Sequence, residues 1–260
     1  MPRPQSRIAM RYLRLYFACL LLALAVASSI HAAPTARPVA APKTVLFVGN
    51  SFTFYNNSLH THLRQLLIAA DPELVFPDSL KSMTISGARL ADHEGGLKQM
   101  LESYDWDVVV LQGHSLEAVD PDQSEAFRSS VERFAQLIRD DGARPMLFMT
   151  WAYSGQPGMT ADLDHAYRSI GDEAGVLVVP VGLAFARAGE EIEGIELRTA
   201  DGKHPTLEGT YLAACVFYGA LYALSPLPLA YDAGLDPALA RHLRRVAWQT
   251  LESYYGSNQR

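Results

Sequence analysis

The alternation of short apolar segments with longer amphipathic ones limits the fold of this chain more than any other feature. Short runs rich in β-branched and aliphatic residues are predicted to be strands, at 44–48, 82–86, 107–112, 145–150 and 176–181. Segments with helical periodicity lie between and after them, at 59–70, 90–103, 123–140, 161–174, 206–223 and 237–255. Strands that alternate with helices indicate a parallel sheet, and mostly continuous apolar strands indicate that helices cover both of its faces. The sequence therefore predicts a three-layer α/β/α sandwich with about five parallel strands.

The N-terminal segment 1–33 has the composition of a secretory signal peptide. A basic stretch precedes an apolar run at 15–27, and the segment contains no acidic residue. The arginines of the basic stretch are Arg3, Arg7, Arg11 and Arg14. Cleavage is expected after Ala27 or near Ala32 or Ala33, which predicts an exported protein, periplasmic or secreted, without stable membrane insertion. An uncleaved anchor helix is the alternative, although the apolar run is slightly short for the ~20 residues that span a bilayer.

After this segment we expect a short Ala/Pro-rich linker at 34–43 and a single domain at 44–260. A domain of this length buries a large fraction of its surface without disulfides or metals. Loss of the four arginines lowers the formal net charge from −6 to −10, which disfavours nucleic acid as a partner. Of the two cysteines only Cys215 would remain, so no internal disulfide is expected, and its apolar surroundings favour a core role.

Polar residues follow the predicted strands at the points where the strands end. Gly49-Asn50-Ser51 follows the first strand, Gly87-Ala88-Arg89 the second, and Gln112-Gly113-His114-Ser115 ends the third. Trp151-Ala152-Tyr153 follows the fourth, and Asp201-Gly202-Lys203-His204-Pro205 precedes a predicted helix. Because parallel strands have their carboxyl ends at one edge of a sheet, where ligands bind in such folds, we expect these segments to converge there.

Ser51, His204 and Asp201 together have the side chains of a nucleophilic acyl-transfer site. A serine nucleophile requires a base, and the base requires an acceptor that orients it. Asp201 precedes His204 by three residues, so its carboxylate can reach back to the imidazole while the other ring nitrogen faces Ser51. Each segment also has an ordinary explanation, since Gly-Asn-Ser forms common turns and the Asp201 segment can be a solvated loop that caps a helix.

In this order the segments resemble the signature blocks of the SGNH, or GDSL-like, serine hydrolases. Val48-Gly49-Asn50-Ser51-Phe52 is similar to the first block in a Gly-Asn-Ser variant, and Ser86-Gly87-Ala88 is similar to the second. Asp201-Gly202-Lys203-His204-Pro205 is similar to the last block, and the resemblance spans about 44–224. It implies a flavodoxin-like α/β fold and an esterase that needs no cofactor and no metal. Ser51 would be the nucleophile, His204 the base and Asp201 the orienting carboxylate.

The third block departs from the family pattern. Gln112-Gly113-His114-Ser115 replaces the usual Gly-x-Asn-Asp, so the asparagine that would donate to the oxyanion is absent. Gln112-Gly113 is similar to the Gln-Gly-Glu element of carbohydrate acetylesterases. That likeness implies that Gln112 completes an oxyanion hole with the backbone N–H groups of Ser51 and Gly87. Two alternatives stay open: Gln112 only ends a strand, or Ser115 takes the place of the asparagine.

Further residues are expected to contact the substrate, namely Asn50, His114, Trp151 and Tyr153. The aromatic side chains can stack on a sugar ring or, alternatively, anchor loops against the core. His114 can line the pocket or replace His204 as the base. No metal site is expected at His60-Thr61-His62, because residues two apart on a helix point in different directions.

These observations predict an exported serine esterase that hydrolyses short-chain acyl esters, such as acetyl esters, of carbohydrate or related substrates. The expected partner is a small-molecule or glycan ester. No Walker loop or Gly-x-Gly-x-x-Gly motif is present, so no nucleotide cofactor is expected. The alternatives are an acyltransferase that uses the same site and a non-catalytic glycan-binding protein with the same fold.

Overall fold

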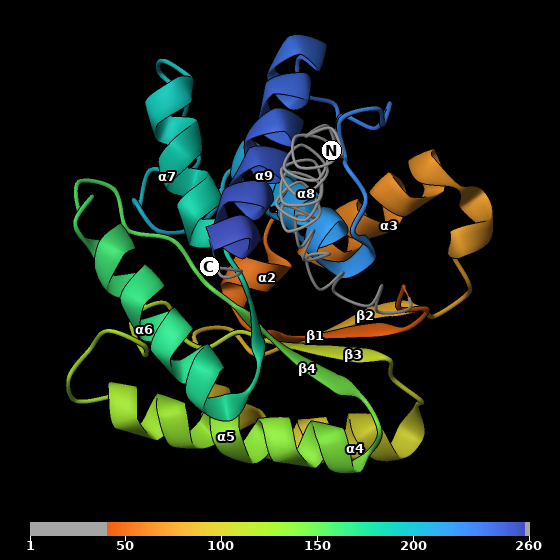
Figure 1. The fold of residues 1–260 in the computed structure, drawn as a ribbon, viewed down its shortest axis with the longest axis vertical. Coiled ribbons are helices and arrows are strands. Elements are labelled where there is room, and N and C mark those ends of the chain that lie inside the picture. The colour runs from red at the N-terminus through yellow and green to blue at the C-terminus, as the bar shows by residue number, and fades with distance from the viewer. Residues whose placement is uncertain (1–40, 258–260) are drawn as a thin grey trace, which may run out of the picture. The chain divides into compact units, whose positions relative to one another are not determined.

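The computed structural model describes residues 41–257, so the predicted signal peptide at 1–33 and most of the linker at 34–43 lie outside the described residues. Within the described part, five parallel strands form one sheet in the order β2-β1-β3-β4-β5 (Figure 1). The strands are Val45–Gly49 (β1), Leu80–Thr84 (β2), Val108–Leu111 (β3), Arg144–Phe148 (β4) and Leu177–Val179 (β5). The order is that of flavodoxin-like folds, and the predicted α/β class is confirmed, with each predicted strand end within two residues of the observed one.

Helices cover both faces of this sheet (Figure 1). On one face lie α4 (Glu94–Ser103), α5 (Ser124–Asp140) and α6 (Met159–Ala174). On the other lie α2 (Ser51–Phe54), α3 (Leu59–Ala70), α7 (Val181–Glu191), α8 (Leu207–Tyr222) and α9 (Pro237–Ser257). Short 3₁₀ turns at Pro72–Leu74 and Leu90–His93 precede β2 and α4.

Alternate side chains of the central strands enter two separate hydrophobic cores, as the two-residue period of a strand requires. In β1, Val45 and Phe47 pack into the core beneath α3, α7, α8 and α9, whereas Leu46 and Val48 pack into the core beneath α4, α5 and α6. All four side chains are fully buried. The strand that leads to Ser51 is therefore held from both faces, which agrees with its continuous apolar sequence.

One helix was absent from the sequence-based predictions. The predicted strand at 176–181 is too long, because β5 ends at Val179 and α7 begins at Val181, directly after Pro180. The buried positions of α7 include Val181, Ala184, Phe185 and Ala188. Their spacing of three, four and seven residues is the signal of an amphipathic helix, so the sequence contained the information.

Helix α8 is buried on almost all sides, between α3 and α9 (Figure 1). A helix that is apolar all round belongs in the interior of a domain. Cys215, the free cysteine of the described residues, lies on α8, where burial raises the pKa of its thiol to about 12. The thiol is therefore a core group, as its surroundings predicted. None of the helices within 41–257 is both long and apolar enough to cross a membrane.

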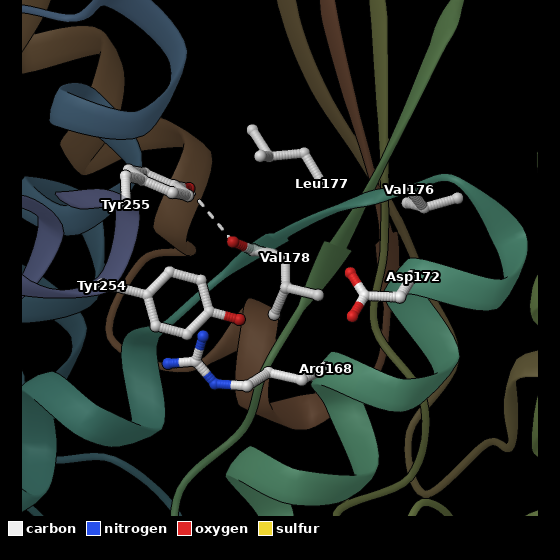
Figure 2. A pocket seen from close by; sticks show the side chains of 7 residues that line it. All are labelled: Arg168, Asp172, Val176, Leu177, Val178, Tyr254 and Tyr255. Carbon is white, nitrogen blue, oxygen red and sulfur yellow. Dashed lines mark hydrogen bonds between the residues drawn. The ribbon is translucent and has the colours of Figure 1, made fainter. Parts of the chain in front are cut away.

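The C-terminal helix α9 contacts the edge strand β5 (Figure 2). The Tyr255 hydroxyl donates a hydrogen bond to the Val178 carbonyl at 3.0 Å. Beside it, the Arg168 guanidinium lies 3.8 Å from the centre of the Tyr254 ring. These residues line a recess of about 280 Å³ at the sheet edge. An edge strand leaves backbone groups without ladder partners, and here a side chain from α9 bonds one of them.

Candidate active site

Ser51 follows the carboxyl end of β1 and is the first residue of the short helix α2. Asn50 caps this helix, because its side-chain Oδ1 accepts a hydrogen bond from the Phe52 N–H at 3.1 Å. β1 is a central strand, paired with β2 on one side and β3 on the other. The turn from strand to helix therefore presents Ser51 at the edge of the sheet where the strands end.

The structure brings Ser51, His204 and Asp201 into one chain of hydrogen bonds. His204 Nε2 lies 2.9 Å from Ser51 Oγ, and His204 Nδ1 lies 2.5 Å from Asp201 Oδ2. A carboxylate only accepts, so the Nδ1 atom carries the proton and Nε2 is left to accept from the Ser51 hydroxyl. Ser51 and His204 are 153 positions apart in the sequence, and the fold makes them neighbours.

Asp201 is partly exposed, yet its carboxylate is fully partnered. Its side chain is 46% exposed. Beyond the His204 ring, Oδ1 accepts from the Lys203 N–H at 2.8 Å, from the His204 N–H at 3.0 Å and from the Thr199 hydroxyl at 2.9 Å. The hydrogen bond from the His204 ring, followed by the one from the Lys203 N–H, holds the pKa of Asp201 far below its usual range. The carboxylate therefore stays ionised and keeps the imidazole in one orientation.

A turn after α2 holds His204 from the side. The Tyr55 ring stacks on the imidazole, with centroids 4.3 Å apart and planes 11° from parallel. The Asn56 side-chain amide donates to the Pro205 carbonyl at 2.9 Å, next to His204 in the chain. Residues 56–58 all have positive φ, at 51°, 66° and 67°, a conformation that asparagine adopts more readily than most residues. The turn therefore connects α2, which carries Ser51, to the loop that carries His204.

Gln112 does not have a free amide to act as the oxyanion donor that we expected, so that expectation is corrected. Its Oε1 accepts from the Asn50 N–H at 3.1 Å and from the Thr53 hydroxyl at 2.9 Å. Its Nε2 donates to Asn50 Oδ1 at 2.9 Å and to the Gly113 carbonyl. Both amide hydrogens are thus used, and the residue is 1% exposed. These hydrogen bonds to Asn50 and Thr53 stabilise the turn that carries Ser51.

Gly87 and Ser51 both line a pocket of about 320 Å³ at this edge of the sheet. Gly87 has φ +67°, and a Cβ atom there would meet no other atom within 4 Å. Glycine therefore allows both the left-handed turn and a close approach of substrate to the backbone. The Ser115 hydroxyl lies on the same pocket, 2.5 Å from the Tyr153 hydroxyl.

Ser51 lines two recesses, which we name the Phe54-side recess and the histidine-side recess. The Phe54-side recess has a volume of about 290 Å³ and is lined by Asn50, Ser51, Phe54, Tyr55, Thr84 and Ser86. The histidine-side recess has a volume of about 320 Å³ and is lined by Asn50, Ser51, Phe52, Ser86, Gly87, His114, Ser115, Leu116, Tyr153, Lys203 and His204. His204 belongs to the lining of the second recess only.

Of the four residues expected to contact substrate, three line a recess. Tyr153 and His114 lie on the histidine-side recess, and Asn50 lies on both. The Asn50 amide is nevertheless engaged within the protein, because its Nδ2 donates to the Ala88 carbonyl at 3.1 Å and to the Gly113 carbonyl at 3.3 Å. His114 lines the pocket, but the ring that bonds Ser51 is that of His204.

Trp151 is a core residue, and the expectation that it contacts substrate is corrected. It is 1% exposed and lies between two parallel rings, Phe52 at 4.5 Å and Phe185 at 4.2 Å between centroids. Its indole N–H donates to the Lys203 carbonyl at 2.9 Å. The alternative role weighed for this aromatic side chain, the anchoring of a loop against the core, agrees with these contacts.

The paired histidines of α3 serve structural contacts. His62 is bonded through Nε2 to the Asn56 carbonyl at 2.7 Å and through Nδ1 to the Tyr231 hydroxyl at 2.8 Å. The His60 ring instead contacts the Ser58 hydroxyl at 2.8 Å. In the part of the chain that the structure describes, no group of three histidine, cysteine or acidic residues is arranged to hold a metal ion.

Comparisons with known proteins address the fold. A DUF4886 family protein from Bacteroides uniformis has a TM-score of 0.62 at 20% identity, over 80% of this chain and 94% of that one. A candidate SGNH hydrolase from Slackia heliotrinireducens has a TM-score of 0.56 at 28% identity, over 67% and 96%. An acetyl xylan esterase from Geobacillus stearothermophilus has a TM-score of 0.51 at 18% identity, over 67% and 92%. No protein-family model and no curated sequence matches significantly. The chain has the fold of the SGNH hydrolases.

Within this SGNH hydrolase fold, sequence reasoning missed the residues that support the candidate triad. The sequence did not predict that Tyr55 contacts His204 or that Asn56 contacts the neighbouring Pro205. The pair Asn56-Asn57 after a short helix is a recognisable signal for a left-handed turn. The partners of that turn lie about 150 positions away, so no local pattern could reveal them.

Proposed function

We propose that this protein is a serine esterase that cleaves acyl esters through a covalent acyl-enzyme. The observation that carries the proposal is the hydrogen-bonded series of Asp201, His204 and Ser51 beside two open recesses. Nucleophile, base and orienting group in hydrogen-bond reach of one another are the signature of an activated serine. A pocket on each side of the serine leaves space for the two halves of an ester.

In the first half of the reaction, Ser51 Oγ attacks the ester carbonyl carbon while His204 Nε2 takes the hydroxyl proton. The carbonyl oxygen becomes negatively charged, and the N–H groups of Ser51 and Gly87 donate to it. When this intermediate collapses, the bond to the alcohol oxygen breaks and His204 gives its proton to the leaving alcohol. Asp201 holds the imidazole in the required tautomer and stabilises its protonated form.

In the second half, a water molecule attacks the acyl-enzyme. His204 Nε2 takes a proton from the water, and the oxyanion again forms against the same two N–H groups. Collapse of this intermediate breaks the bond to Ser51 Oγ, which regains its proton from His204, and the carboxylic acid leaves. The balance is one ester and one water consumed, with one acid and one alcohol released.

The proposed substrates are short-chain acyl esters, such as acetyl esters, of carbohydrates or small molecules. The similarity to an acetyl xylan esterase supports this class, as does the small volume of the two recesses, at about 290 and 320 Å³. Export to the periplasm or the medium is part of the proposal and rests on the composition of segment 1–33.

The test is hydrolysis of 4-nitrophenyl acetate by the wild type, by Ser51→Ala and by the exposed control variant Ser103→Ala. We expect Ser51→Ala to lower kcat by about 10⁴–10⁶ while leaving the melting temperature unchanged, and Ser103→Ala to match the wild type. A fluorophosphonate probe followed by peptide mapping should label Ser51. Near-full activity of Ser51→Ala would move the nucleophile elsewhere. Transfer of acetyl to an added sugar in preference to water would make the enzyme an acyltransferase instead.

A further inference from the structure

The two recesses beside Ser51 differ in charge. The lining of the Phe54-side recess contains no side chain that is charged at neutral pH. The lining of the histidine-side recess contains Lys203, His114 and His204 but no carboxylate. A wall with only basic groups is unexpected in a chain whose formal net charge is −6. The difference indicates that the two halves of the substrate differ in charge as well.

Arg89 adds a second cation near this wall. It is exposed, and its charge acts on His114 together with that of Lys203: burial is the largest cause that lowers the pKa of this histidine, and the two cations follow. The Lys203 ammonium lies 5.0 Å from the centre of the Tyr153 ring. Among residues 41–257, neither Arg89 nor Lys203 forms an ion pair.

The nearby acidic groups do not cancel both cations at the pocket surface. Glu117 is 2% exposed, and its Oε2 accepts from the His114 N–H at 2.5 Å and from the Leu90 N–H at 3.1 Å. It is therefore turned toward the backbone behind the wall. Burial raises the pKa of this carboxyl, and the positive charge of Arg89 acts in the opposite direction. Asp201 is already bonded to the His204 ring. One positive charge, that of Lys203, is left facing the recess without a carboxylate partner.

The position of His204 decides which half of the ester lies against these cations. In the proposed mechanism His204 Nε2 protonates the leaving alcohol, so the alcohol must lie beside that nitrogen. His204 lines the histidine-side recess and not the Phe54-side recess. The alcohol portion of the substrate therefore lies against Lys203, and the acyl group lies against Phe54 and Thr84.

We propose that this site selects esters whose alcohol portion carries a negative charge, such as the carboxylate of an acylated acidic sugar. Lys203 is its specificity-determining residue. This inference rests on the proposed esterase function, because it uses the direction in which the alcohol leaves. It narrows the substrate class from carbohydrate esters in general to anionic ones.

The test compares a methyl glucuronoside and a methyl glucoside that are monoacetylated at the same hydroxyl, with acetate release as the measurement. For the wild type we expect kcat/KM to favour the glucuronoside by about two- to fivefold, as an ion pair near a protein surface gives. The preference should shrink as the salt concentration rises from about 0.05 M to 0.5 M, since salt screens exposed charges. Lys203→Met should reduce the ratio, whereas Lys98→Met, which changes a lysine paired with Glu94, should preserve it.

Several outcomes would overturn the inference and leave the esterase standing. A ratio near one in the wild type, or a ratio that Lys203→Met does not change, would do so. Faster cleavage of 4-nitrophenyl hemisuccinate than of 4-nitrophenyl butyrate would place the anion in the acyl half and contradict the assignment. Binding to Ser51→Ala by calorimetry tests the inference without turnover: the acetylated glucuronoside should bind more tightly than the glucoside. Equal binding of the two would refute the inference, whereas a wild type inactive on every ester would refute the proposed function.

Discussion

Ser51 and His204 meet across 2.9 Å, but they reach that point from different kinds of structure. The turn that carries Ser51 is a buried network in which Asn50 is 2% and Gln112 1% exposed. Its hydrogen bonds join residues about 60 positions apart in the sequence. The loop that carries His204 is largely exposed, and the bonds around Asp201 join residues no more than three positions apart.

This difference teaches that the two halves of the candidate triad depend on different parts of the fold. The serine half depends on the sheet, because its partners come from separate strands. The histidine half organises itself within one loop and is attached to the serine half by Tyr55 and Asn56. Substitutions in the buried serine half should therefore lower the free energy of unfolding. Substitutions in the exposed histidine half should lower kcat with little loss of stability.

The largest expected effect is that of His204→Ala in the exposed half. We expect kcat for 4-nitrophenyl acetate to fall by about 10⁴–10⁶, because the proposed base and acid is removed. The melting temperature should stay close to that of the wild type, since the loop is exposed. His165→Ala, which removes an exposed histidine of α6, is the matched control. Comparable losses in both variants would contradict the role of His204.

The next effect is that of Asp201→Asn, for which we expect a loss of about 10²–10⁴ in kcat, because an amide can stabilise the wrong imidazole tautomer. The pKa of Asp201 is lowered, so this carboxylate remains ionised as the pH falls through the range in which carboxyl groups usually protonate. We therefore expect that Asp201 does not contribute a protonation to the acid limb of the wild-type rate profile. A rate profile that shows two separate protonations in the acid limb would contradict this.

The third effect is smaller and concerns stability rather than catalysis. It is expected for Gln112→Ala in the buried serine half. The substitution leaves the Asn50 N–H and the Thr53 hydroxyl without their shared acceptor. We expect the free energy of unfolding in urea to fall by about 3 kcal/mol, because each buried polar group left unpaired costs about 1–3 kcal/mol. Thr199→Val removes one hydrogen bond to the exposed Asp201 and should cost less than about 1 kcal/mol. Equal losses in the two variants would refute the distinction between the halves.

The smallest effect is expected at Asn56, which connects the serine half of the candidate triad to the histidine half. Asn56→Ala removes the hydrogen bond to the Pro205 carbonyl and should lower kcat by about tenfold through displacement of His204, with KM nearly unchanged. Asn56→Gly suits the positive φ of 51° but lacks the amide, so it separates backbone strain from the lost contact. If the glycine variant regains the full rate, the amide has no positioning role.

The parts of the fold that repeat a local pattern could be predicted from the sequence. The strands and most helices follow from apolar periodicity, and α3 has the predicted bounds of 59–70. The grouping of Ser51, Asp201 and His204 followed from the order of the motifs and from the topology of parallel strands. These features depend on residue type and spacing, which a sequence displays directly.

The directions of side chains could not be predicted in the same way. Gln112 follows β3, as expected, but its amide turns toward Asn50 rather than toward the pocket. Trp151 is held between Phe52 and Phe185, two rings far from it in the sequence. Which of several polar or aromatic side chains at a strand end faces the ligand depends on packing between distant elements, and that packing has no local signature.

The contact between Tyr255 and Val178 has a consequence for how the chain is made. The two residues are 77 positions apart, so β5 emerges during synthesis well before α9 exists to bond its outer carbonyl. Until then the nascent sheet has an open side that another polypeptide can join. Completion of α9 supplies the hydroxyl that bonds this carbonyl, so this part of the sheet edge is covered only after the last helix of the described chain has been made.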